Sequence, residues 1–175
     1  AEIVSELYGV IREAAGDAVV IACNAVSHLS AGIFEVYRTG DDTSGRLWSR
    51  TRAYGVNTLA FRLCQNNAFY KIDADCVGII PGKIDWSLNR QWLRLLSVSG
   101  SPLFISVKPD DITDGMKEDI KKAFSRNSGQ KDKAEPLDWL YNNQPQCWLI
   151  NGEKREYDFV ENSYPELLSG STQSY

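Results

Sequence analysis

The sequence predicts an α/β fold in which a parallel sheet is followed by a shorter β-rich region. Short apolar runs rich in β-branched residues alternate with helical patterns four times, which is typical of βα units. The first run, residues 18–23, is continuously apolar, as expected when helices cover both faces of a sheet. Beyond residue 128 the alternation stops, and two apolar runs flank Asn151-Gly152, a dipeptide that favours a tight hairpin.

Each element can be placed from its own pattern. Residues 2–15 repeat apolar side chains at a helical spacing, and Gly16 follows as a natural stop. The strand candidates are residues 18–23, 33–39, 69–75 and 102–107. Helical patterns follow the last three of them, over residues 47–61, 88–100 and 113–124.

A polar stretch over residues 125–133 interrupts this rhythm. We therefore expect a boundary near Ser128, with residues 1–128 in one unit. Residues 129–175 are then a linker and the start of a β-rich region. Within them, residues 146–150 and 155–160 are predicted as antiparallel strands joined by the hairpin.

Composition limits the classes of function. With 175 residues, 43% hydrophobic and 24% charged, the chain can bury one ordinary core. The formal net charge of −4 gives no electrostatic reason to expect nucleic acid or an anionic membrane as a partner. No run of 18 apolar residues occurs, and nothing in the sequence assigns a localisation.

The cysteines and the histidine give no support for a metal or cofactor site. Four cysteines lie far apart without a CxxC motif, and His28 is the single histidine of the chain. We expect free, buried thiols. For His28, a structural or surface role is favoured over a catalytic one.

Polar side chains gather where the four predicted strands end. Because the carboxyl ends of parallel strands meet at one edge of a sheet, these residues are candidates for a common site. They are Cys23 with Asn24, Arg38 with Asp41 and Asp42, Asp73 with Asp75, and Ser106 with Lys108. Any single aspartate here has an alternative role as a helix cap or turn residue. An arginine among several carboxylates suits a polyhydroxylated ligand, since these groups donate to and accept from hydroxyls.

Three tryptophans are further candidates for contact with a sugar. Trp92 fits the apolar stripe of a helix and is predicted to lie in the core. Trp86 follows a loop, so a role in stacking against a sugar is more open for Trp86 than for Trp92. Trp48 could also offer a stacking face.

The motif from Arg38 to Asp42 resembles the Arg-x-x-x-Asp motif at the end of barrel strand six in the α-galactosidase, or melibiase, group of retaining glycoside hydrolases. "KIDADCVGI" is similar to that family's segment after strand seven, and "WSLNRQWLRLLSVSGSPLFIS" to its last helix and strand. The similarity runs from about Val19 to Phe124. It implies the carboxyl-terminal half of a (β/α)8 TIM barrel, about four βα units, followed by the start of a β-rich domain.

The resemblance also implies roles for the candidate residues. Asp42 matches the general acid/base, and Arg38 matches a residue that binds a sugar hydroxyl beside it. Asp73 and Asp75 match carboxylates that shape the pocket. Cys23, Asn24 and Asp41 lie at the same strand ends and are expected to contact substrate, without any metal.

The expected function is retaining hydrolysis of α-glycosides by two carboxylates. The family's nucleophile, in a Lys-x-Asp motif on strand four, has no match here, because Lys71-Ile72-Asp73 fits strand seven. The chain alone is therefore expected to be inactive. The alternatives are a non-catalytic carbohydrate-binding or assembly fragment, and an unrelated doubly wound enzyme, for which no nucleotide motif is present.

The expected partners are a carbohydrate substrate and a polypeptide. In a half barrel the outer strands, residues 18–23 and 102–107, have unpaired edges that carry no charge to protect them. We expect the missing amino-terminal half of the barrel, or a second copy of the chain, to cover these edges. No cofactor is expected.

Overall fold

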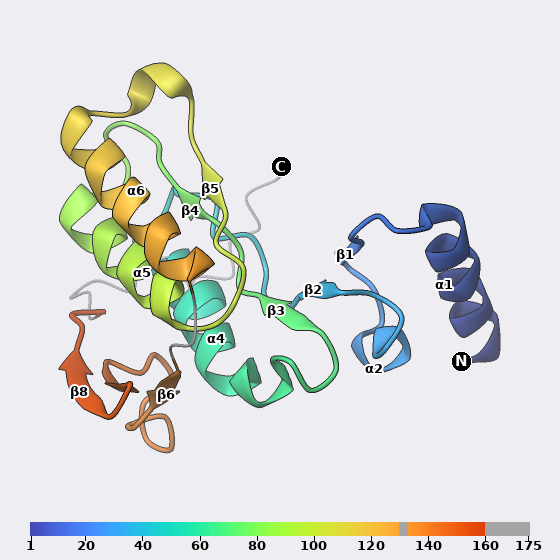
Figure 1. The fold of residues 1–175 in the computed structure, drawn as a ribbon. Coiled ribbons are helices and arrows are strands. Elements are labelled where there is room, and N and C mark those ends of the chain that lie inside the picture. Colours follow the sequence, from blue (N-terminus) through green and yellow to red (C-terminus); the bar gives the residue numbers. More distant parts are fainter. Residues whose placement is uncertain (130–132, 160–175) are drawn as a thin grey trace, which may run out of the picture.

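The computed structural model describes residues 1–129 and 133–159. It is a mixed α/β structure in which α1 and α2 lie at one end and α5 and α6 at the other (Figure 1). The helical segments are α1 (Glu2–Ala15), α2 (Ser27–Ser30), α3 (Trp48–Arg50), the π-helical η1 (Thr51–Val56), α4 (Asn57–Arg62), η2 (Leu63–Gln65), α5 (Trp86–Val98), η3 (Pro109–Asp111) and α6 (Asp114–Ser128).

The strands form three small sheets. Two are parallel: β1 (Ile21–Ala22), β2 (Val36–Arg38) and β3 (Lys71–Asp73) pair in that order, and β4 (Val77–Gly78) pairs with β5 (Ile105–Ser106). The third is antiparallel and contains β6 (Ala134–Pro136), β7 (Cys147–Ile150) and β8 (Glu153–Glu156). The predicted parallel pairing is confirmed for the first three predicted strands. The fourth, at β5, pairs with β4, which lies outside the predicted third strand of residues 69–75. The parallel strands lie in two sheets and not in one continuous curved sheet, so the half barrel stays a prediction.

The helices at the α5 and α6 end begin at capping residues that the sequence provides. The Asp85 side chain accepts a hydrogen bond from the Ser87 backbone NH at 2.7 Å, and Thr113 accepts one from Met116 NH at 3.3 Å. Such caps satisfy backbone donors that the first turn of a helix leaves unpaired. The two helices then pack side by side (Figure 1).

One apolar core connects the parallel strands, the helices and the antiparallel sheet. Trp92 and Trp148 are fully buried in this cluster. The prediction that Trp92 belongs to the core is confirmed. Trp48 is also buried, so its suggested role as a sugar-stacking face is wrong. The boundary near Ser128 stays a prediction, and residues 130–132 and 160–175 of the second unit lie outside the described residues.

The hairpin between β7 and β8 forms where Asn151-Gly152 predicted it. Both residues have a positive φ, 52° for Asn151 and 85° for Gly152, which a two-residue type I′ turn requires. Strand β8 begins earlier than expected, at Glu153, and ends at Glu156. Val160, the last residue of the predicted strand, lies outside the described part of the chain.

The cysteines are free, as expected, but they are not all buried. Cys23 and Cys64 are exposed, whereas Cys76 and Cys147 are partly buried. The prediction of four buried thiols is wrong, because Cys23 lies just after β1 and Cys64 lies in the short helix η2, and both are at the surface. His28 is exposed, which agrees with a surface role.

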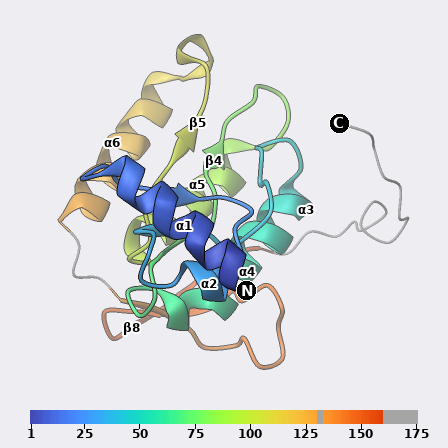
Figure 2. The same cartoon turned by 90° about the vertical axis from the view of Figure 1, so that its right-hand side faces the viewer.

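Helix α1 is attached to the sheet by polar contacts at its base. Arg12 forms an ion pair with Glu35 at 2.6 Å and donates to the Ala18 carbonyl at 2.8 Å. The hydrogen bond from Val20 NH is the main cause that lowers the pKa of Glu35, although burial opposes it. Figure 2 shows α1 in front of the strands. No described helix combines the length and the apolar character that crossing a membrane requires.

Candidate functional site

The candidate site is centred on Arg38, the last residue of β2. Its Nη2 lies 2.8 Å from Asp42 Oδ1 and 3.0 Å from Asp75 Oδ2. The register of the parallel sheet places Arg38 opposite Asp73. Strand pairing therefore brings the loops after β2 and β3 together, as the sequence predicted.

Asp75 connects these two loops. Its Oδ2 accepts hydrogen bonds from Thr43 NH at 2.6 Å and from Thr43 Oγ1 at 2.8 Å, in addition to the contact with Arg38. Its backbone is left-handed, with φ of 72°, and its NH donates to Asp73 Oδ1 at 2.8 Å. Asp73 and Asp75 are both buried. These contacts make Asp75 the anchor that holds the Asp42 loop in place.

Asp41 faces a second arginine. Its Oδ1 accepts from Asp42 NH at 2.7 Å, and its Oδ2 lies 3.4 Å from Arg50 Nη2. Arg50 also donates through Nε to the Asp42 carbonyl at 3.1 Å and lies over the Tyr54 ring. The loop is thus held from both sides, by Asp75 and by Arg50.

Among the carboxylates around Arg38, Asp42 is the one that faces solvent. Its side chain is 64% exposed, compared with 12% for Asp75 and 15% for Arg38. A soluble ligand that reaches the site therefore meets the Asp42 carboxylate first. Arg38 is less exposed, and its contact with Asp42 Oδ1 fixes the orientation of the Asp42 carboxylate.

Burial sets the electrostatics of the inner part of the site. It raises the pKa of Asp73, although the Asp75 NH and Arg38 act in the opposite direction. Burial also raises the pKa of the Cys76 thiol to about 12, so this thiol is protonated and unreactive at neutral pH. Burial acts to lower the pKa of Arg38, but the attraction of Asp75 and the other carboxylates outweighs it, and the pKa is raised.

One donor of Arg38 is left over. Both carboxylate contacts involve Nη2, and the buried Nε has no hydrogen-bond partner among the described residues. Buried polar atoms without partners are rare in folded proteins and point to a functional or a strained position. This donor lies in the polar cluster that the sequence singled out.

The Asp42 loop is fixed to the sheet by a close approach of two glycines. Gly45, with φ of 71°, crosses β4 at Gly78. A Cβ at Gly78 would lie 2.6 Å from Gly45 N and 2.7 Å from its Cα. The Gly78 carbonyl in turn accepts from Asn89 Nδ2 at 2.7 Å, which ties β4 to α5.

We expect Gly78→Ala to lower the free energy of unfolding by about 1–3 kcal/mol, since the added methyl group meets backbone that cannot move cheaply. Chemical denaturation followed by circular dichroism measures this loss. Gly115→Ala is the matched control, because a Cβ there meets nothing within 4 Å. Equal stability of the two variants would contradict the close packing of this loop.

The remaining candidates do not join the cluster. Cys23 and Asn24 follow β1 and are exposed, and neither forms a hydrogen bond with the Arg38 cluster within the described residues. Ser106, the last residue of β5, and Lys108, just beyond it, are both exposed. Sequence reasoning missed Thr43, which is buried between the two loops. Its place directly after Asp42 was the available signal.

The fold and the cluster together define a mixed α/β protein with an arginine and carboxylates at the ends of parallel strands. No family model and no curated protein matches the sequence. In structure, the chain is similar to an α-galactosidase from Thermus thermophilus, solved in complex with p-nitrophenyl α-D-galactopyranoside. The TM-score is 0.62 at 16% identity, over 89% of this chain and 33% of that chain. At this identity the likeness shows a distant relationship in fold, and the chain spans about a third of that enzyme's length.

Proposed function

We propose that this chain is part of a glycoside hydrolase that acts on α-glycosides by a retaining two-carboxylate mechanism. The observation that carries the proposal is the Arg38–Asp42 pair, which ends a parallel strand and presents its carboxylate to solvent. The fold similarity to an α-galactosidase supports it. In α/β proteins, ligands bind beyond the carboxyl ends of the strands, which is where this pair lies.

Asp42 is the general acid/base in this proposal. It gives a proton to the leaving oxygen of the glycoside while a nucleophile attacks the anomeric carbon. In the second step it takes a proton from the water that releases the sugar. Arg38 positions Asp42 through the contact of its Nη2 with Asp42 Oδ1 and is proposed to bind a sugar hydroxyl beside it. Asp41, Cys23 and Asn24 remain proposed contacts to substrate at the same strand ends.

The nucleophile in this proposal comes from outside the chain. In a retaining enzyme the two carboxyl groups lie about 5–5.5 Å apart across the scissile bond. Asp75 is a poor candidate, because its Oδ2 already accepts two hydrogen bonds from Thr43 and forms an ion pair with Arg38. Asp73 is buried and accepts a hydrogen bond from a backbone NH. Both carboxylates are better suited to shaping the pocket.

The test compares the chain alone with the complete protein of which it is proposed to be a part. We expect the complete protein to hydrolyse p-nitrophenyl α-galactoside with retained configuration, measured by NMR of the first-formed sugar. The chain alone is expected to be slower by several orders of magnitude, because one member of the carboxylate pair is absent.

Robust turnover by the purified chain would place the nucleophile inside it, with Asp73 and Asp75 as the first residues to replace. Saturable binding of sugar without hydrolysis by the complete protein would favour the alternative, a non-catalytic carbohydrate-binding fragment. An inverted product would contradict the retaining mechanism.

A further inference from the structure

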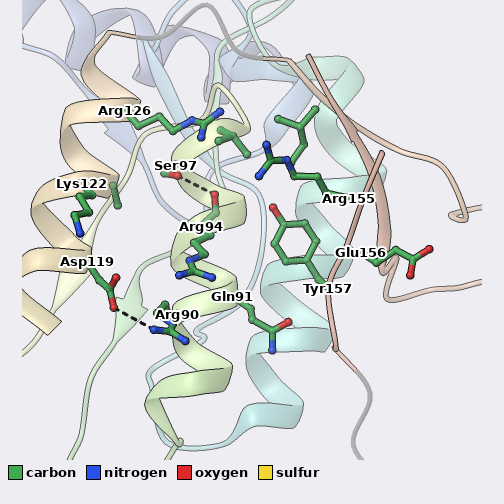
Figure 3. Close-up of a pocket in the computed structure, with 13 residues that line it drawn as sticks. Arg90, Gln91, Arg94, Ser97, Asp119, Lys122, Arg126, Arg155, Glu156 and Tyr157 are labelled. Carbon is green, nitrogen blue, oxygen red and sulfur yellow. Dashed lines mark hydrogen bonds and ion pairs between the residues drawn. The ribbon is translucent and has the colours of Figure 1, made fainter. Parts of the chain in front are cut away.

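A cavity between α5, α6 and the β7–β8 hairpin has no part in the proposed reaction. It has a volume of about 440 Å³ and is enclosed by α5, α6 and the strands β7 and β8 (Figure 3). This size is within the range of small-molecule sites. Five cationic side chains line it, namely Arg90, Arg94, Lys122, Arg126 and Arg155, against two carboxylates, Asp119 and Glu156.

The two carboxylates are already engaged. Asp119 accepts a hydrogen bond from Trp86 Nε1 at 3.1 Å and lies 3.8 Å from Arg90 Nη1. Glu156 pairs with Lys154 at 2.8 Å, a residue that does not line the cavity. Arg155 in turn pairs with Glu153 at 3.1 Å, so the uncompensated positive charge of the wall lies at Arg94 and Lys122. In a chain with a formal net charge of −4, this excess of positive charge is a local feature.

Arg94 of α5 and Lys122 of α6 are the cations with the least compensation. Neither forms an ion pair with a carboxylate anywhere in residues 1–129 and 133–159. Figure 3 shows both side chains on the walls of the cavity, from two different helices. An anion bound in the cavity therefore has cationic side chains from both helices on its walls.

A tyrosine adds a neutral polar group to the lining of the cavity. Tyr157 is partly buried, and its ring carries the hydroxyl into the space beside Arg155 and α5 (Figure 3). Burial raises the pKa of Tyr157, while Arg155, Arg126 and Arg94 act against the rise. The hydroxyl is thus a neutral donor at physiological pH. The buried Ser97 and Ala123 also line the cavity.

We propose that this cavity binds the phosphate group of a small molecule. Guanidinium groups bind phosphate oxygens through paired, charge-assisted hydrogen bonds, and an ammonium group adds a point charge. The walls provide both kinds of donor, and the Tyr157 hydroxyl is a neutral donor in the lining. The site is independent of the Arg38 cluster, so its existence does not rest on the proposed glycosidase activity.

The experiment titrates the full chain with inorganic phosphate by isothermal calorimetry, with sodium chloride added to keep the ionic strength constant. We expect saturable binding at one site. The double variant Arg94→Gln, Lys122→Gln should weaken it by about tenfold or more, since two charge-assisted contacts are lost. Both side chains are exposed, so thermal unfolding should be unchanged.

The matched control is Lys117→Gln, Lys121→Gln, which removes the same charge from the outer side of α6. Lys117 and Lys121 pair with Asp114 and Glu118 and do not line the cavity. The control should bind phosphate within about twofold of the unmodified chain, as expected for screened surface charges. Absence of saturable binding in the unmodified chain would overturn the proposal. Equal weakening in both double variants would overturn it too, because it would reveal a general charge effect.

Discussion

Asp42→Asn in the complete protein should lose about 10²–10⁴-fold of its activity on natural α-glycosides, which is the usual contribution of a general acid/base. The leaving oxygen of a natural glycoside needs a proton as the bond breaks, and an amide cannot provide it. An activated aryl glycoside has a leaving group that needs no proton. The variant should therefore still release p-nitrophenolate in an initial burst and accumulate the glycosyl-enzyme, because water is no longer activated.

The measurement pairs burst kinetics on p-nitrophenyl α-galactoside with mass spectrometry of the trapped intermediate. In this variant the amide oxygen of the new side chain can still accept from Arg38, so the loop should keep its position. Asp110→Asn is the control, since Asp110 is also an exposed carboxylate beyond a parallel strand but lies outside the Arg38 cluster. Near-normal turnover of a natural glycoside by Asp42→Asn would remove Asp42 from this role.

Local sequence patterns were enough to predict the long helices and the order of the strands. Helix α1 has the predicted bounds, and α5 is displaced by two residues from the expected range of 88–100. Caps, stop signals and helical spacing act within a few residues, so one sequence contains them. The strands are shorter than expected because pairing, and not apolar character, sets their length.

The break in the long helix after β2 could not be predicted, because it depends on distant residues. The π-helical η1 contains Arg52, which is buried and donates to Gln144 Oε1 and to the Phe159 carbonyl, both at 2.9 Å. Gly55 of the same segment lies against Trp92 of α5. In the sequence, Gln144 and Phe159 are 92 and 107 residues away from Arg52. Tertiary packing therefore overrides the regular helical spacing here.

The candidate site was predictable only where its contacts are local in the sequence. Arg38 and Asp42 are four residues apart, and their contact follows from the turn at the end of one strand. The contact of Thr43 with Asp75 joins two loops, and it depends on the left-handed backbone at Asp75. No residue type demands that conformation, so the end of β3 at Asp73 and the separate strand β4 beyond the predicted range of 69–75 were missed.

The exposed face of α1 predicts association. Ile3, Leu7 and Val10 recur on one side of the helix, and their exposed fractions are 81%, 54% and 62%. Beside them, β1 pairs with β2 on one edge and has no strand on its other edge within the described residues. An apolar helix face next to an open strand edge favours pairing with another polypeptide. We propose that the occupant is the amino-terminal half of a barrel or a second copy of the chain.

Light scattering during size exclusion, with mass spectrometry of the peak, should therefore show a species heavier than the 19.6 kDa chain. Leu7→Glu, Val10→Glu should dissociate it, because two buried carboxylates without partners oppose the interface strongly. Leu140→Glu, Tyr141→Glu is the control, since these side chains are 80% and 85% exposed in the loop before β7 and should leave the mass unchanged.

A stable 19.6 kDa monomer without a companion peptide would contradict the half barrel, because a half barrel cannot leave this face uncovered. The two parallel sheets would then have to form a self-contained open structure, and the α1 face would be an ordinary solvated surface.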